Sequence, residues 1–347
     1  MEIGGDYSWS VFPGAPVAPW PQPAVLYARG RDCIVGLARA GSAIWSTNQL
    51  WVPDYFCEDV AAAWQAAGVR VSNYNAMPGR VDGLPKGSRG DAVLVVNFFG
   101  VENLEETTAK LMGAGYCVFE DHTHDPVGSA AAGSRAHYCL AALRKYLPIT
   151  DGALLWSPQG LQLPEVPPER FDQHDGVAAM GLKAAYESGQ CNDKELKQRF
   201  RQLQHAHHEQ IESGDAPLRP SMWSEAQLQS GLPLAWRERR DENARCLVKA
   251  LSDAQGITTL FQDWGAGTVP YCVPVLFESE QARDSTRQAL IASQVYPPVH
   301  WSLNQAEWDL AAALSRRILS LPCDHRYDVA DMRRIASVLT QHVLTIT

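Results

Sequence analysis

Short apolar runs alternate with amphipathic stretches between residues 24 and 157. Leu50 to Phe56 is a candidate strand, and Val60 to Gly68 follows with alanines at helical spacing and a glycine where a helix would end. Asp91 to Phe99 is a continuous run rich in β-branched residues, which is typical of a strand buried on both faces of a sheet. The repeated order of strand and helix predicts a largely parallel sheet sandwiched between helices.

Polar residues follow the next two predicted strands. Asn97 lies near the end of the run from Asp91, and Asp121 directly follows the candidate strand from Tyr116 to Glu120. The carboxyl ends of strands in parallel sheets are where ligands bind. We therefore expect Asn97 and Asp121 to face a site.

The second half of the chain predicts a smaller α/β unit after a charged helical region. Residues 176 to 213 are helical in pattern and end near two prolines, and a long helix follows from Pro233 to about Ala254. Further predicted elements are Tyr271 to Phe277 (strand), Gln281 to Ser293 (helix), Val295 to Trp301 (strand), Ala306 to Leu319 (helix) and Val329 to Val343 (helix). We predict an N-terminal segment (1–23), a large domain (24–235) and a small C-terminal domain (236–347).

Composition and charge narrow the classes of partner. The 347 residues are 46% hydrophobic and 20% charged, which excludes a disordered chain, and the net charge of -9 gives no support to binding of phosphate backbones. No run approaches the ~18 apolar residues of a membrane span, and the N-terminus lacks the pattern of a secretory signal. The eight cysteines have no Cys-x-x-Cys spacing, which favours a reduced compartment. We expect a cytoplasmic protein that binds small molecules or other proteins.

The most informative motif lies in the large domain. Phe119-Glu120-Asp121-His122-Thr123-His124 is followed, 24 residues after Asp121, by Lys145 in Leu-Arg-Lys-Tyr-Leu-Pro, and then by Asp151-Gly152 and an apolar strand. An acid at a strand end, a lysine on a later turn and a following strand are what a pyridoxal phosphate (PLP) enzyme of fold type I needs.

These residues resemble the DegT/DnrJ/EryC1/StrS aminotransferases, especially a divergent branch with a Ser-Leu-Arg-Lys-like motif before a Pro and an Asp-Gly. The resemblance implies a fold type I PLP-dependent transferase, with a mostly parallel central sheet sandwiched by helices, a smaller C-terminal α/β domain and pyridoxal 5'-phosphate as cofactor. It extends over most of the chain, through Tyr27 to Leu37, Val52 to Cys57, Val96 to Gly100 and Leu319 to Pro322.

The resemblance also implies roles for individual residues. Lys145 would form the Schiff base with the cofactor and then move the proton during transfer, and Asp121 would keep the pyridine nitrogen protonated. His124 replaces the family's glutamine and would donate to the ring hydroxyl from a neutral ring. Phe56 or Tyr55 would stack on the ring face. The alternatives are a surface lysine at 145, a helix N-cap at 121 and ordinary core aromatics.

The phosphate would lie at the turn Gly30-Arg31-Asp32, which precedes an apolar helix and has a guanidinium where the family has a hydroxyl. Ala142 replaces a family serine three residues before the lysine, and Asn97 replaces a family histidine at a cofactor-binding turn. The family's Asn-x-Arg loop is not recognisable in residues 215–225. These departures concern the substrate and the phosphate more than the amine chemistry.

Two histidine-containing segments are candidate metal ligands. Neighbouring positions in His205-Ala206-His207-His208-Glu209 do not converge on one ion if the segment is helical, so a solvated helix face is expected there. Asp121, His122 and His124 lack a matching downstream ligand cluster. We therefore predict no metal site.

The resemblance predicts an aminotransferase that converts a nucleotide-linked keto sugar, with glutamate as amino donor and the keto compound as acceptor. It also predicts a homodimer. From the net charge and the lack of a long apolar run, we expect no nucleic-acid or membrane partner. Two alternatives stay open. One is a catalytically altered or inactive member of the fold that binds a ligand or partner protein, and the other is a PLP enzyme of another reaction type, such as a dehydratase or decarboxylase.

Overall fold

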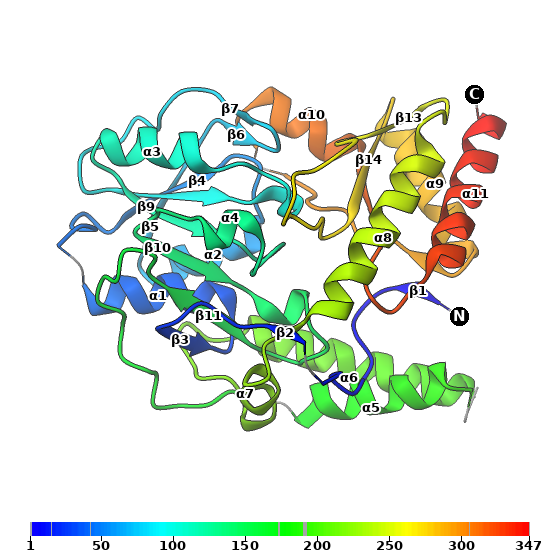
Figure 1. Ribbon diagram of the computed structural model, residues 1–347, viewed down its shortest axis with the longest axis horizontal. Helices are drawn as coiled ribbons and strands as arrows, with labels where there is room; N and C mark the ends of the chain where they lie inside the picture. Colours follow the sequence, from blue (N-terminus) through cyan, green and yellow to red (C-terminus); the bar gives the residue numbers. More distant parts are fainter. Residues whose placement is uncertain are drawn as a thin grey trace.

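The computed structural model describes residues 2–346 except 15, 42, 173, 190–192 and 305, with side chains up to residue 343. Cys191, one of the eight cysteines, therefore lies outside the described residues, and the other seven are free thiols. None of the described helices is both long enough and apolar enough to cross a bilayer. Figure 1 shows a larger α/β part and a smaller part that contains the C-terminus.

A seven-stranded sheet forms the centre of the larger part, in the order β3-β11-β10-β9-β8-β4-β5. Strand β11 is antiparallel to both of its neighbours, and the other neighbouring strands run parallel. The prediction of a mostly parallel sheet is confirmed. The strands are β3 (Ala24–Tyr27), β4 (Gln49–Pro53), β5 (Arg70–Tyr74), β8 (Ala92–Val96), β9 (Cys117–Asp121), β10 (Tyr138–Ala141) and β11 (Ala153–Trp156).

Helices cover both faces of this sheet (Figure 1) because the side chains of each strand alternate between two apolar cores. On β8, Leu94 packs with α1 (Gly30–Ala40) and α2 (Glu58–Ala66), whereas Val93 and Val95 pack with the helices of the other face. Those helices are α3 (Glu105–Gly113) and α4 (Ser129–Ala132). All five residues of β8 are buried, as the continuous apolar run predicts.

The smaller part is built on an antiparallel sheet in the order β13-β14-β16. Its own core joins this sheet to three long helices. The elements are α8 (Leu234–Leu251), β13 (Ile257–Thr259), β14 (Val273–Phe277), α9 (Glu280–Ala292), β15 (Val295–Tyr296), α10 (Asp309–Arg317), β16 (Ile318–Leu321) and α11 (Val329–Ile346).

Two predictions for this part were wrong. The predicted helix over residues 306–319 ends at Arg317, and the buried strand β16 follows because it pairs with the central strand β14. The predicted strand over residues 295–301 shortens to β15, which pairs with the N-terminal strand β1 (Ile3–Gly4).

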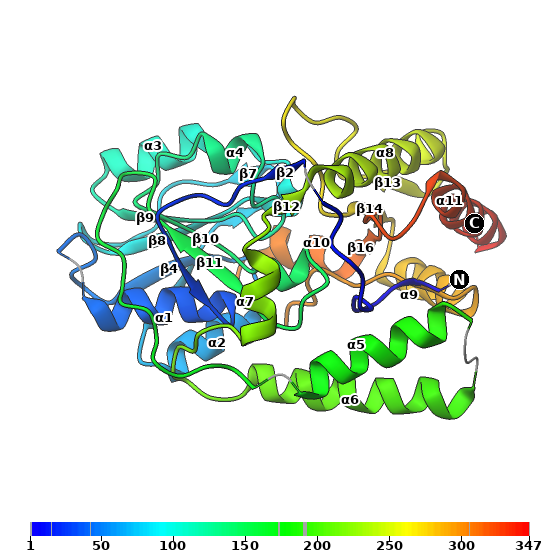
Figure 2. The same cartoon turned by 60° about the horizontal axis from the view of Figure 1, so that its bottom comes forward.

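The N-terminal segment contacts both parts. Strand β1 adds to the smaller part through β15, and β2 (Val17–Ala18) pairs with β12 (Leu232–Pro233) just before α8. Helices α5 (His174–Glu187) and α6 (Lys194–Glu212) form an antiparallel pair below both parts in Figure 2. The short helix α7 (Met222–Leu228) follows them.

Candidate functional site

The turn after β8 holds the loop after β9 in place. The Asn97 backbone N–H donates to the Asp121 carbonyl (3.0 Å), and the Asn97 side-chain oxygen accepts from the Glu102 N–H (3.0 Å). Gly100 has a φ of +83°, and a Cβ there would lie 2.7 Å from the His124 carbonyl oxygen. Only glycine fits this close approach. Asn97 thus anchors the turn, and its side chain does not line the cavity described next.

A cavity of about 240 Å³ lies at the carboxyl ends of β9 and β10, and we call it the central cavity. Asp121, the last residue of β9, and Lys145, the last residue of the 3-10 turn η2 (Leu143–Lys145), both line it. Lys145 is the only one of the seven lysines, all of them described, in this wall. The sequence-based pairing of an acid with a lysine is thus present in one cavity.

Asp121 is oriented by its own loop. One carboxylate oxygen accepts from the Thr123 backbone N–H at 2.8 Å. The Thr123 hydroxyl in turn accepts from the Ala142 N–H at 2.9 Å, which ties the loop after β9 to the residue before η2. The loop that carries Asp121 and the turn that carries Lys145 are therefore directly linked.

His124 presents a defined nitrogen to the central cavity. Its Nδ1 accepts from the Phe99 backbone N–H at 3.0 Å, so the proton of the neutral ring lies on Nε2. Burial lowers the pKa of His124 well below its ordinary value, which keeps the ring neutral. The ring stacks against Tyr271 (4.6 Å between centroids, 16°) and Trp301 (6.0 Å, 17°). His124 is thus a fixed hydrogen-bond donor.

The two aromatic candidates occupy different places. Phe56 lines the central cavity and stacks on Trp64 with the ring centroids 5.6 Å apart. Tyr55 packs behind Trp301 in edge-to-face geometry, and its hydroxyl donates to the His300 carbonyl oxygen. Tyr55 is fully buried and does not line the cavity. Phe56 is therefore the residue that can cover a flat ring.

The three residues of the predicted phosphate turn, Gly30-Arg31-Asp32, lie in two different environments. Gly30 and Arg31, at the start of α1, line the central cavity, and a Cβ on Gly30 would lie 3.0 Å from the Ala142 Cβ. Asp32 does not line it, because its carboxylate forms a buried ion pair with Arg29 at 2.9 Å. Burial outweighs the effect of Arg29 and raises the pKa of Asp32. Asp32 thus anchors the start of α1.

A carboxylate already lies beside Arg31. Glu212, the last residue of α6, pairs with Arg31 at 2.8 Å and with Arg144 at 3.4 Å. Arg31 is buried and also donates to the carbonyl oxygens of Ile211 (3.2 Å) and Ser213 (3.1 Å). Its guanidinium is thus fixed by the end of α6, while the Glu212 side chain is 53% exposed and can move away.

A second cavity of about 190 Å³, which we call the polar cavity, shares Arg144 and Lys145 with the central cavity. Its wall contains the fully buried Arg240, which stacks over the Tyr146 ring at 4.3 Å and donates to the Tyr7 hydroxyl at 3.2 Å. Charged and polar residues from the N-terminal segment, α6 and the smaller part complete it, among them Asp6, His207, His208, His300, Asp324 and Arg326.

The structure separates the candidate metal ligands around Asp121: Asp121 and His124 both line the central cavity, whereas His122 does not. His122 faces away from Asp121 and pairs with Glu120 at 2.9 Å. On α6, His207 contacts the Thr150 carbonyl (3.0 Å), whereas His208 contacts Asp6 (3.0 Å). The histidines of α6 therefore diverge, as expected for one helix, but His207 is buried, so the expectation of a solvated helix face is wrong at this residue.

Sequence reasoning missed several residues of the two cavities. Trp301, Glu212 and Arg240 come from segments far from the motif in sequence, and no local pattern identifies them. Arg144 had a signal, because it directly precedes Lys145, the predicted catalytic lysine, and shares its turn.

Comparison with known proteins identifies the fold. No protein-family model and no curated protein sequence matches the chain. Solved structures similar to it include DesI in the presence of its TDP-sugar product (TM-score 0.59, 17% identity, 93% of this chain and 82% of that one). The chain is also similar to a DegT DnrJ EryC1 StrS aminotransferase from Brucella abortus (TM-score 0.57, 17% identity, 92% of this chain and 86% of that one). A further similar structure is Helicobacter pylori PseC, an aminotransferase involved in the biosynthesis of pseudoaminic acid (TM-score 0.59, 14% identity, 93% of this chain and 87% of that one). The predicted fold, that of the fold type I aminotransferases, is confirmed.

Proposed function

We propose that this protein is a PLP-dependent aminotransferase that moves an amino group between an amino-acid donor, glutamate, and a keto acceptor of the nucleotide-sugar type. The observation that carries the proposal is that Lys145 and Asp121 line one cavity at the carboxyl ends of parallel strands. The similar solved structures support it, since the Brucella abortus and Helicobacter pylori proteins are aminotransferases and DesI was solved in the presence of its TDP-sugar product.

The residues of the central cavity fit the groups of PLP. The aldehyde needs an amine, which Lys145 offers, and the pyridine nitrogen needs an acid, which Asp121 offers. The Nε2–H of His124 suits the ring hydroxyl, and Phe56 suits a ring face. The start of α1 suits the phosphate, because backbone N–H groups and the helix dipole attract anions.

When bound, PLP supplies an aldehyde that exchanges amines and a ring that withdraws electrons from the substrate carbon. Lys145 would hold the aldehyde carbon until the substrate amine displaces it. The freed Lys145 amine would then carry a proton between the substrate carbon and the cofactor C4' carbon. Its half-buried position between the central and polar cavities suits contact with both cofactor and substrate.

Asp121 would keep a proton on the ring nitrogen. Its orientation is set by the Thr123 N–H, so the carboxylate needs no rearrangement when the ring enters. The polar cavity would receive the substrate, because it adjoins Lys145 and combines cationic side chains with the carboxylates of Asp6 and Asp324. Such a mixed lining suits a substrate with many polar groups.

Absorbance spectra of the purified protein with PLP, before and after adding glutamate, test this function. We expect a visible band that glutamate shifts and that a keto acceptor restores. Borohydride reduction and peptide mapping should find the cofactor on Lys145. A label on another lysine would reject the assigned site, and a protein that stays colourless with added PLP would reject the cofactor.

A second function is favoured by one observation. Arg31 is paired with Glu212, and Ala142 offers no hydroxyl, so the phosphate end of the central cavity holds a carboxylate instead of an open anion site. A carboxylate at this position is what we expect in a protein of this fold that binds a ligand and does not transfer an amino group. The same spectra separate the two functions, because binding without transfer leaves the visible band unchanged by glutamate.

We also propose that the protein is a homodimer, because active sites of this fold generally lie at a subunit interface. Exposed apolar side chains such as Trp9, Val11 and Met222 support a covered surface. Light scattering at micromolar concentration should find twice the 38.2 kDa mass of the chain. An active species with the mass of one chain would contradict the dimer.

A further inference from the structure

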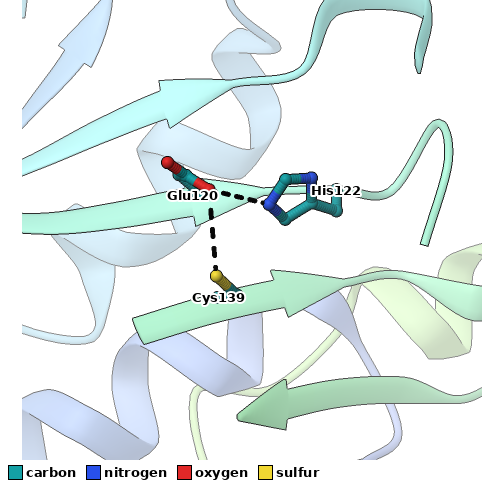
Figure 3. Close-up of side chains that lie close together, drawn as sticks. All are labelled: Glu120, His122 and Cys139. Atoms are coloured by element: carbon teal, nitrogen blue, oxygen red, sulfur yellow. Dashed lines mark hydrogen bonds and ion pairs between the residues drawn. The ribbon is translucent and has the colours of Figure 1, made fainter. Parts of the chain in front are cut away.

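A second cluster of reactive side chains lies on the opposite face of the central sheet. Figure 3 shows Glu120 and His122, from β9 and the residue just after it, beside Cys139 of β10. Because side chains alternate along a strand, Glu120 and His122 face away from the central cavity that Asp121 lines. Cys139 joins them because it is the register partner of Glu120 on the neighbouring parallel strand.

The ligand atoms of this cluster are close enough for one metal ion. The Glu120 Oε2 lies 2.9 Å from the His122 Nε2 and 4.0 Å from the Cys139 Sγ, and all three atoms are within 4.8 Å of one another. Zinc bonds of about 2.0 to 2.3 Å in tetrahedral geometry place O, N and S ligands about 3.3 to 3.5 Å apart. The observed separations lie on either side of these values, so small side-chain rotations bring the three atoms to one ion.

Two hydroxyl groups orient the cluster. The Thr108 hydroxyl donates to the other Glu120 oxygen at 2.5 Å, and the Ser134 hydroxyl lies 3.2 Å from the Cys139 sulfur. Hydrogen bonds of this kind hold carboxylate and thiolate ligands in place at metal sites. The three ligand residues have at most 1% exposure, so a carboxylate held here together with a deprotonated thiol would need a compensating charge. A dication supplies it.

A cavity adjoins the Glu120 side of this cluster. A third cavity, of about 600 Å³, lies between α3, α4 and the segment at Gly265–Thr268, and Glu120, Thr108 and Ser134 all line it. Its polar wall next to Glu120 leaves room for water as a fourth ligand.

We propose that Glu120, His122 and Cys139 form a Zn²⁺ site with water in the fourth position. The donor set of one carboxylate, one imidazole and one thiolate is one that zinc takes in proteins. The site is separated from the central cavity by the sheet, so the inference holds whether or not the chain is an aminotransferase. The competing explanation is a buried hydrogen-bonded Glu–His pair with a thiol beside it.

The test uses the full chain, stripped with a chelator and titrated with Co²⁺ as the probe, followed by competition with Zn²⁺. We expect one equivalent of Co²⁺ and a thiolate-to-cobalt charge-transfer band in the near ultraviolet. Cys139→Ser should abolish the band and weaken Zn²⁺ binding at least about 100-fold, because a ligand is lost. The matched control is Cys117→Ser, a buried cysteine on β9 that faces the other core, and it should keep both.

Two further results decide between the explanations. Thr108→Val keeps the three ligands and should weaken Zn²⁺ binding about 10- to 100-fold, which remains measurable if Cys139→Ser fails to fold. The histidines of α6 can also bind Co²⁺, but imidazole ligands alone give no thiolate charge-transfer band. A wild-type protein without the band, or equal loss of the band in Cys117→Ser and Cys139→Ser, would overturn the proposal.

Discussion

Replacing Glu212 with glutamine should tighten PLP binding if the phosphate lies at Arg31. In the structure the Glu212 carboxylate pairs with Arg31 (2.8 Å) and Arg144 (3.4 Å). A phosphate bound at Arg31 would compete with this carboxylate for the same two guanidinium groups. Glutamine keeps the size of the side chain and removes its charge. Arg31 stays in place in the variant, because it also donates to the carbonyl oxygens of Ile211 and Ser213.

The magnitude follows from the repulsion between the carboxylate and the phosphate. Two unit charges about 4 Å apart interact by about 1 kcal/mol in water and about 4 kcal/mol near a protein surface. Because the Glu212 side chain is 53% exposed, solvent and salt weaken this repulsion, and we expect it to cost PLP binding about 1 to 2 kcal/mol. This corresponds to a PLP dissociation constant about 5- to 30-fold lower in Glu212→Gln.

Absorbance titrations with PLP and with pyridoxal, which has no phosphate, measure the effect. We expect the gain for PLP alone, since only PLP carries the competing charge. Glu209→Gln is the matched control, because Glu209 lies on the same helix and pairs only with the exposed His205 in the described part of the chain. Equal or weaker PLP binding by Glu212→Gln would refute the reasoning, because it would mean that the carboxylate supports Arg31 and does not compete with phosphate.

Three other predictions concern the site and its support. Asp121→Asn should keep the fold and lower the transamination rate about a hundredfold, because an amide cannot hold the ring nitrogen protonated. Circular dichroism checks the fold and steady-state kinetics measure the rate. An unchanged rate would show that Asp121 does not contact the ring nitrogen. Arg29→Ala removes the ion-pair partner of the buried Asp32 carboxylate and should lower the free energy of unfolding by about 3 to 5 kcal/mol. Urea denaturation measures this loss, and the double variant Arg29→Ala/Asp32→Ala should recover part of it. The hydrogen bond to Asp6 raises the pKa of His208, so this contact contributes fully below about pH 6.5 and is lost as the pH rises through the raised pKa. Protection factors for amide exchange over residues 4–7, which remove the intrinsic rise of the exchange rate with pH, should therefore fall above this raised pKa in the wild type and change less in His208→Gln.

The sequence predicted the larger part well because its signals are local. The run that forms β8 is apolar on both faces, and the alternation of strands with helices leaves few other ways to bury it. Local signals also explain why the strand β16 was not predicted. Residues Ile318–Leu321 continue the apolar pattern of α10 without a break, so the pattern alone extends the helix. What ends the helix is the pairing of this strand with β14, a contact more than forty residues away in sequence.

The pairing of Lys145 with Asp121 could be predicted from the motif that resembles the aminotransferases. In the structure Asp121 ends β9 and Lys145 follows the parallel strand β10, and the carboxyl ends of such strands meet. The roles of Arg29, Arg31 and Asp32 could not. These neighbours on the chain are sorted by contacts with the end of α6 and the segment after it, which lie far away in sequence. Only the fold determines that Arg29 and Arg31 both line the central cavity while Asp32, paired with Arg29, does not.

The segment Glu120-Asp121-His122 shows how one strand end can serve two sites. Alternation sends Asp121 to the central cavity and its two neighbours to the other face, so the sequence alone separates the three side chains. It cannot supply Cys139, because that thiol joins Glu120 only through the register of β9 with β10. We therefore expect substitutions at His122 or Cys139 to leave the Asp121 side chain and its contact with Thr123 in place, so the proposed zinc binding and the proposed amino transfer should respond to different substitutions.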